Sequence, residues 1–225
     1  QAGQPHGRRS RQQRGLLARS HHATSPRIAI RGLFDSMKYN FGSAMPKRSW
    51  FHVILTYYGN WLPGDPRGFR TRHHKTHVEG DYKNPPPKGL YEGLYQSSQD
   101  SLKQSRLVLS AQQQMVVGNA FLETFNICAV PVLAIAVHST HLHLQGEFDP
   151  ARVRILCGKA KRNAWFRLCE VGLNLKLWAK RGKYQPIKDY QHHKNTHAYI
   201  LKHSDENAWV WKWNKKGGSV IHLPK

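Results

Sequence analysis

Runs of β-branched and aromatic residues alternate along this chain with polar segments in which apolar residues recur at helical spacing. The run Ser49–Tyr57 (SWFHVILTY) is typical of a central β-strand. Two further apolar runs, 127–137 and 141–148, are separated by a short polar break, which predicts a β-hairpin. A fourth strand with a turn is expected over 175–187.

Three other segments space their apolar residues as an amphipathic helix does. They cover residues 99–119, 150–171 and 189–204. Gly118-Asn119 is expected to end the first helix. Asp149-Pro150 supplies a cap and a first helical position for the second.

The elements therefore follow the order β, α, β-hairpin, α, β and a trailing helix. This order predicts an α+β fold: a ferredoxin-like or RRM-like antiparallel sheet (βαββαβ) with helices on one face and a C-terminal helix that carries Tyr199. The folded domain is expected over 46–204, after a basic, disordered N-terminal arm (1–45) and before a C-terminal extension (205–225). Residues 60–88, rich in Gly, Pro, Arg and His, are expected to form a long functional loop.

The charge balance gives the first indication of a partner. The 225 residues include 35 Lys and Arg but 13 Asp and Glu, a formal net charge of +22. Such an excess repels itself unless a polyanion is bound, so the composition favours a nucleic-acid partner without separating DNA from RNA. A basic protein whose charge only aids solubility is the alternative.

Neither the apolar stretches nor the cysteines predict a membrane or secreted protein. The most apolar stretch, 121–137, is short and is interrupted by Glu123, Asn126 and Pro131. The three cysteines form no CxxC pair and imply no disulfide framework. We therefore expect a cytoplasmic protein without a membrane partner.

The triplet His141-Leu142-His143 lies at the start of a predicted strand. Successive strand residues point to opposite faces, so the two histidines share a face while Leu142 enters the core. Two neighbouring imidazoles can bind one divalent ion. Because the chain has 15 histidines, the triplet alone is equally compatible with two half-exposed strand histidines.

The last predicted helix contains Tyr199 and His203, which are four residues apart and therefore lie on one helical face. A phenol, with a pKa of about 10, is a poor nucleophile at neutral pH. A metal ion that polarises a scissile phosphate makes attack by tyrosine feasible, and His203 could complete its site. The alternative is an amphipathic helix that packs Tyr199 on the sheet and leaves His203 in solvent.

Together, these residues resemble the HUH endonucleases, and most closely the single-tyrosine transposases of small insertion sequences and their REP-associated relatives. In that family the histidine pair follows a tight turn on a central strand, as in 139–144 (STHLHL). The tyrosine lies on a C-terminal helix, here within 199–203 (YILKH), where many members have glutamine at the last position. The segment 177–184 (LWAKRGKY) is also similar, and the resemblance covers about residues 49–204.

The resemblance implies that the folded domain is catalytic, and it implies a role for each residue of the site. His141, His143 and His203 would hold Mg²⁺ or Mn²⁺, and Tyr199 would attack single-stranded or hairpin DNA of mobile or repeated elements. The products would be a 5′-phosphotyrosine and a free 3′-OH. The family includes monomers and homodimers, and a DNA substrate implies association with the nucleoid.

Two other groups of residues are candidates for nucleic-acid contacts. The basic helix is expected to touch phosphates, although a solvated face is an equal alternative; the residues are Lys159, Lys161 and Arg162. Tryptophans near the C-terminus could stack unpaired bases, but an edge strand that packs them on the sheet is favoured; they are Trp209, Trp211 and Trp213.

Two rival functions remain open at this point. A non-catalytic RRM-like protein would read RNA with exposed aromatics at the centre of the sheet, where this sequence places paired histidines. A zinc-stabilised DNA-binding module would use His73, His74 and His77, which have no cysteine or acidic residue nearby.

Overall fold

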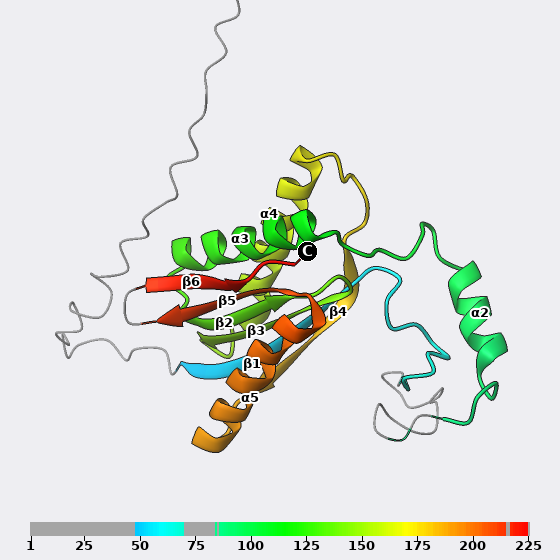
Figure 1. Cartoon of the computed structure of the whole chain (residues 1–225), viewed down its shortest axis with the longest axis horizontal. Helices are drawn as coiled ribbons and strands as arrows, with labels where there is room; N and C mark the ends of the chain where they lie inside the picture. Colours follow the sequence, from blue (N-terminus) through cyan, green and yellow to red (C-terminus); the bar gives the residue numbers. More distant parts are fainter. Residues whose placement is uncertain (1–47, 70–83, 85, 215–216, 225) are drawn as a thin grey trace, which may run out of the picture. The chain divides into compact units, whose positions relative to one another are not determined.

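The computed structural model describes residues 48–69, 84, 86–214 and 217–224. Six strands of these residues form one antiparallel sheet in the order β4-β1-β3-β2-β5-β6 (Figure 1). The strands are β1 (Ser49–Tyr57), β2 (Val132–Val137), β3 (His141–Phe148), β4 (Trp178–Pro186), β5 (Trp209–Asn214) and β6 (Gly217–His222). The helices are α2 (Glu92–Asp100), α3 (Ala111–Ile127), α4 (Val153–Glu170), α5 (Tyr190–Lys202) and the short 3₁₀ turn η1 (His203–Glu206). The predicted α+β class is confirmed.

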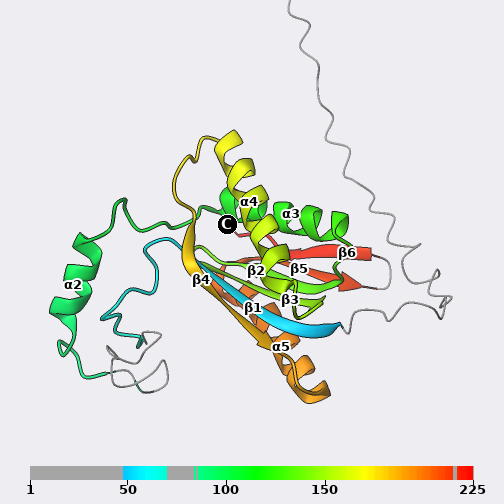
Figure 2. The same ribbon diagram turned by 180° about the vertical axis from the view of Figure 1, so that it is seen from behind.

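The sheet separates two layers of helices. α3 and α4 pack together against one face, and α5 lies across β2 and β3 on the other (Figures 1 and 2). Strand side chains alternate between the two faces. Val53 and Leu55 of β1 therefore enter the core beside α3 and α4, while His52 lies on the α5 face.

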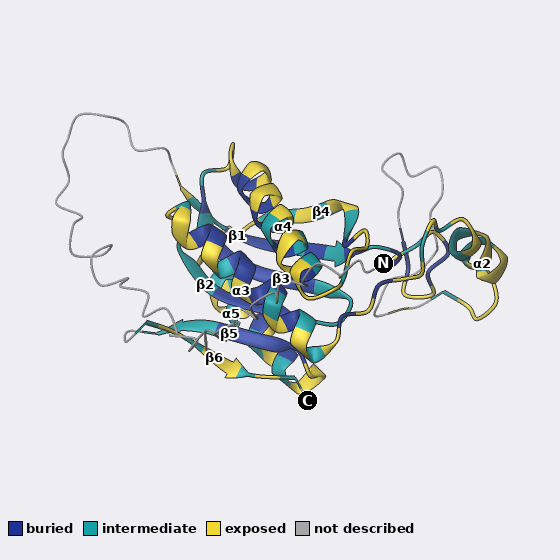
Figure 3. Ribbon diagram, turned by 90° about the horizontal axis from the view of Figure 1, so that it is seen from above, coloured by how far each residue is buried: buried dark blue, intermediate teal, exposed yellow. Residues whose placement is uncertain are grey.

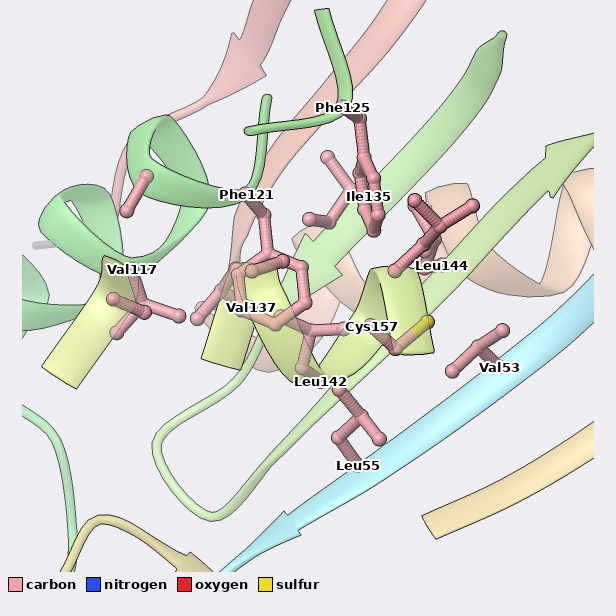
Figure 4. Close-up of a cluster of buried hydrophobic side chains, with 14 of the residues drawn as sticks. Val53, Leu55, Val117, Phe121, Phe125, Ile135, Val137, Leu142, Leu144 and Cys157 are labelled. Carbon is pink, nitrogen blue, oxygen red and sulfur yellow. The ribbon is translucent and has the colours of Figure 1, made fainter. Parts of the chain in front are cut away.

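The main core fills the space between the sheet and the α3–α4 layer. Figure 4 shows side chains of the strands, such as Leu144, meeting those of α3, such as Phe121. Buried positions follow one side of α3 and of α4, whereas consecutive residues of the central strands are buried on both faces (Figure 3). A smaller cluster lies under α5, where Ile200 packs with Ala134 and Ala136 of β2. These small side chains let α5 approach the sheet closely.

Helix α3 differs from its prediction at both ends. It begins after Ser110, which forms a capping box with Gln113: each side chain accepts a hydrogen bond from the other residue's backbone N–H. It also continues past Gly118 to Ile127. A Cβ atom on Gly118 would lie 2.2 Å from the Trp209 ring, so this glycine permits close packing and does not end the helix. The predicted helix end was wrong.

The segment between α2 and α3 was also predicted to be helical, and it is not. Leu107 and Leu109, whose spacing suggested a helix, are buried in the main core from an irregular segment. Their backbone N–H groups donate to the carbonyls of Tyr58 and Ser139, which takes the place of helical hydrogen bonding.

None of the described helices has the length and apolarity needed to cross a bilayer.

The tryptophan-rich strand β5 is an interior strand. It pairs with β2 on one side and with β6 on the other, so the expected edge position was wrong. Trp209 and Trp211 are buried in the main core, as the packing alternative predicted. A Cβ atom on Gly218 of β6 would clash with the Trp211 ring, so this glycine makes room for one tryptophan of β5.

Candidate active site

The central strand β3 presents His141 and His143 on the α5 face of the sheet. Leu142 between them is fully buried in the core on the opposite face. The ring centroids of the two histidines are 4.8 Å apart. Both imidazoles therefore face the same space beneath α5.

Helix α5 brings Tyr199 to this space. The helix begins after Asp189, whose carboxylate accepts a 2.7 Å hydrogen bond from the N–H of His192. Ile200 is buried against the sheet and fixes the rotation of the helix. The Tyr199 ring then lies 5.2 Å from the ring of His143, while 49% of the residue remains exposed.

His203 follows α5 directly, as the first residue of η1. Its ring centroid lies 4.9 Å from that of Tyr199, 4.6 Å from that of His143 and 5.7 Å from that of His141. One ring nitrogen from each of the three histidines lies within 4.8 Å of the other two. We call His141, His143 and His203 the three-histidine cluster.

Each histidine of the cluster has a hydrogen-bond partner at Nδ1. Nδ1 of His141 contacts Oγ1 of Thr140 at 2.9 Å, and Nδ1 of His203 contacts the Glu206 carboxylate at 2.9 Å. Nδ1 of His143 lies 2.9 Å from Nε2 of His52. With the proton on Nδ1 in each case, Nε2 keeps a lone pair for a metal ion. Nε2 of His203 is buried and has no hydrogen-bond partner within the described part of the chain, which fits such a ligand.

The strand histidines of the cluster are uncharged at neutral pH. Burial lowers the pKa of His141 to about 3, and repulsion from His138 adds to the effect. Burial also lowers the pKa of His143, as do the neighbouring imidazoles. Neutral imidazoles are the form that binds metal ions. The donor set therefore fits a divalent cation.

Sequence reasoning missed two residues that hold the cluster. His52 of β1 is buried next to His143, and burial, followed by repulsion from Lys183, lowers its pKa to about 4. Glu206 lies three residues after His203, and its carboxylate is also 4.0 Å from Nε2 of His138. The alternation in β1 places His52 on the face opposite the main core, but it does not show that His52 meets His143.

The predicted phosphate-binding residues lie away from this cluster. Lys159, Lys161 and Arg162 belong to α4, on the opposite face of the sheet from α5. The Nζ atom of Lys161 donates to the Ala179 carbonyl at 3.4 Å and lies over the Trp178 ring, so it also has a structural role. Their contact with nucleic acid stays a prediction.

The described residues give little support to the two rival functions. The RRM-like reading needs exposed aromatics at the sheet centre, but β1 and β3 present His52, His143 and Gln145 there, beneath α5. Zinc binding by His73, His74 and His77 falls outside the residues that the structure describes, as do the arm 1–45 and most of the loop 60–88.

The geometry of the three-histidine cluster is compatible with an HUH site. No family model matches the sequence, and no curated protein matches it. Among solved structures, the chain is similar to one described as a REP-associated tyrosine transposase bound to a REP hairpin. The match has a TM-score of 0.40 and 10% sequence identity, and it covers 75% of this chain and 74% of the other.

Proposed function

We propose that this protein is a metal-dependent endonuclease and strand transferase that cuts single-stranded DNA and becomes joined to it through Tyr199. The observation that carries the proposal is the convergence of one exposed phenol with three imidazoles. The Tyr199 ring lies 5.2 Å and 4.9 Å from those of His143 and His203, which come from a strand and a turn distant in sequence.

The proposed reaction is a transesterification. The Tyr199 oxygen forms a bond to phosphorus as the bond from phosphorus to the 3′ oxygen breaks. The phenol loses its proton and the departing oxygen gains one, which leaves a 5′-phosphotyrosine and a free 3′-OH. No redox partner is needed, and the reverse reaction can join the strand to another 3′-OH. A divalent ion at the three-histidine cluster, Mn²⁺ or Mg²⁺, would neutralise charge on the scissile phosphate and on the leaving oxygen.

The chain's own residues would hold this site in one arrangement. Thr140, His52 and Glu206 fix the ring orientation of the three ligands through their Nδ1 atoms. Ile200 and Asp189 fix the rotation and the start of the helix that carries the nucleophile. Mn²⁺ is the first ion to test, because imidazole ligands suit it better than they suit Mg²⁺, which prefers oxygen.

Two other tyrosines are less suitable nucleophiles. Tyr184 of β4 pairs with Val53 and so faces the core side of the sheet, where Arg154 lies over its ring. Tyr190 starts α5, and nine residues of helix separate it from Tyr199 by about 13 Å along the axis. The geometry therefore favours Tyr199.

A DNA substrate is supported by charge on the same face. In the β1–β4 pairing, Lys183 stands opposite Ile54, which in turn stands opposite His143. Residues paired in this way share a face, so the exposed Lys183 lies on the α5 face next to the cluster. With the net charge of +22, this edge strand offers a path for a phosphate backbone. We propose single-stranded or hairpin DNA of mobile or repeated elements as the substrate.

The proposal is tested with a DNA hairpin that has unpaired flanks and a label at its 3′ end. A 5′-phosphotyrosine keeps the downstream piece, so Mn²⁺ should give a labelled protein adduct that survives SDS. Tyr199→Phe should abolish the adduct and keep DNA binding, whereas the matched variant Tyr190→Phe should keep both. An adduct of undiminished yield in Tyr199→Phe would contradict the proposal.

A further inference from the structure

The segment that follows β1 presents an exposed tryptophan in an unusual conformation. Trp61 has a φ of +63° and is 52% exposed. Large side chains rarely adopt this left-handed region, which glycine and asparagine occupy more easily. The guanidinium carbon of Arg67 lies 4.6 Å from the centroid of the indole ring. The two side chains therefore form a stacked pair at the surface.

Buried polar groups hold this pair in place from both sides. Asn60, before the tryptophan, is buried and donates to the Leu107 carbonyl at 2.8 Å. Asp65, after it, is buried and accepts from the backbone N–H of Arg67 at 3.0 Å and from its Nε at 2.8 Å. Because the guanidinium is held by a carboxylate, its plane is fixed over the indole.

This segment starts at the end of β1 that lies against the turn leading into the three-histidine cluster. The N–H of Tyr57 donates to the Thr140 carbonyl at 3.1 Å, one residue before His141. The N–H of Asn60, the residue before Trp61, donates back to the Tyr57 carbonyl at 3.2 Å, so the chain turns directly after β1. Trp61 therefore follows, by four residues, the strand end that adjoins this turn, and Arg67 stacks on it.

We propose that Trp61 and Arg67 form a subsite in which an unpaired base of the DNA strand stacks on the indole, beside the three-histidine cluster. The inference rests on the proposed function and adds the chemistry that would select unpaired over paired DNA. An indole stacks on any base without sequence preference. Asp65 occupies two nitrogens of the guanidinium, and the third can donate to a neighbouring phosphate. A base inside a duplex is covered on both faces by its stacked neighbours, so the subsite favours unpaired bases.

The subsite explains why a tryptophan stands where the backbone favours glycine. Trp61 is not among the residues of either described apolar cluster, so the hydrophobic core does not account for it. The neighbouring Gly59 and Gly64 also have positive φ values, and a Cβ atom at either would meet the backbone of Arg106 or Tyr95, which explains the glycines there. A bulky residue held in a strained, exposed conformation is a common feature of ligand-binding sites.

The test uses the full chain with Tyr199→Phe, so that DNA is bound and not cut. 2-Aminopurine replaces one unpaired base at a time in the flanks of a DNA hairpin, and its fluorescence falls when it stacks on an aromatic ring. We expect one flank position to lose fluorescence on binding. Adding Trp61→Ala should restore that fluorescence and weaken binding about 10-fold, while Trp61→Phe should retain part of both effects.

Phe166→Ala is the matched control. Phe166 is also 52% exposed, but it belongs to α4, on the face of the sheet opposite the three-histidine cluster. It should change neither signal. Quenching and affinity that persist after Trp61→Ala would overturn the subsite. An adduct formed on the same DNA by the chain with Tyr199 intact would then show that the proposed function stands without it. A chain that neither binds the hairpin nor forms the adduct would remove both proposals together.

Discussion

Nε2 of His52 lies 2.9 Å from Nδ1 of His143, although 91 residues separate them in sequence. The two imidazoles are stacked, with centroids 5.2 Å apart, and both are buried. If Nε2 of His143 binds a cation, its Nδ1–H donates to His52. In that case His52 would set both the orientation and the tautomer of the ligand without touching the cation itself.

Loss of this contact is expected to weaken metal binding. His52→Ala should lower the affinity for Mn²⁺ about 10- to 100-fold, the usual range for an outer partner of a ligating histidine. His52→Gln, whose amide oxygen can accept the same hydrogen bond, should lose less. Isothermal titration with Mn²⁺ measures both, and His222→Ala on the distant strand β6 serves as the control. Equal affinities in all three variants would show that His52 does not orient the ligand.

Glu206 is expected to act on His203 in the same way. Its carboxylate accepts from Nδ1 of His203 at 2.9 Å, which increases the basicity of Nε2. Glu206→Gln should reduce the affinity for Mn²⁺ by about 10-fold, at the low end of the outer-partner range, because a neutral acceptor replaces a charged one. The matched change Glu170→Gln on α4 should leave the titration unaltered. A Glu206→Gln titration that matches the wild type would remove this carboxylate from the site.

The two candidate sets of phosphate-binding cations give opposite results in a salt titration. If DNA runs along the α5 face, Lys183→Ala should reduce the slope of log Kd against log salt by about 0.7, the value for one phosphate of a single strand. Arg162→Ala on α4 should leave that slope unchanged. A reduced slope for Arg162→Ala alone would instead support the α4 residues that the sequence suggested.

The site was predictable where its geometry is local. The shared face of His141 and His143 follows from the period of a strand, and the nearness of Tyr199 to His203 follows from the pitch of a helix. His52 was not found, because its contact depends on the register between β1 and β3, which no local pattern reveals.

Most elements of the fold were predictable for the same reason. The prediction failed where a residue packs against, or bonds to, a residue distant in sequence. Gly118 has the sequence signature of a helix end, yet it accommodates the ring of Trp209 from β5. Leu107 and Leu109 belong to a run of apolar residues at helical spacing, yet backbone hydrogen bonds to Tyr58 and Ser139 hold them in an irregular segment. Tertiary packing overrides local propensity at these positions.

The packing role of Gly118 predicts an unusual response to alanine. Gly118→Ala should lower the free energy of unfolding by about 1–3 kcal/mol, because the added methyl group collides with the Trp209 ring. Gly158→Ala in α4 should raise it by up to about 1 kcal/mol, because a Cβ atom there meets nothing within 4 Å and alanine favours a helix. Urea unfolding compares the two. A stabilised Gly118→Ala would show that the ring can move aside.

The most direct measurement of the central claim is the position of the nucleotide on the protein. After reaction with Mn²⁺ and hairpin DNA, the adduct is digested with nuclease and trypsin and analysed by mass spectrometry. Cleavage after Lys194 and Lys202 releases residues 195–202 (NTHAYILK), in which Tyr199 is the single tyrosine. We predict that this peptide carries the added phosphonucleotide mass. The same mass on the peptide of Tyr184 or of Tyr190, with residues 195–202 unmodified, would contradict the account.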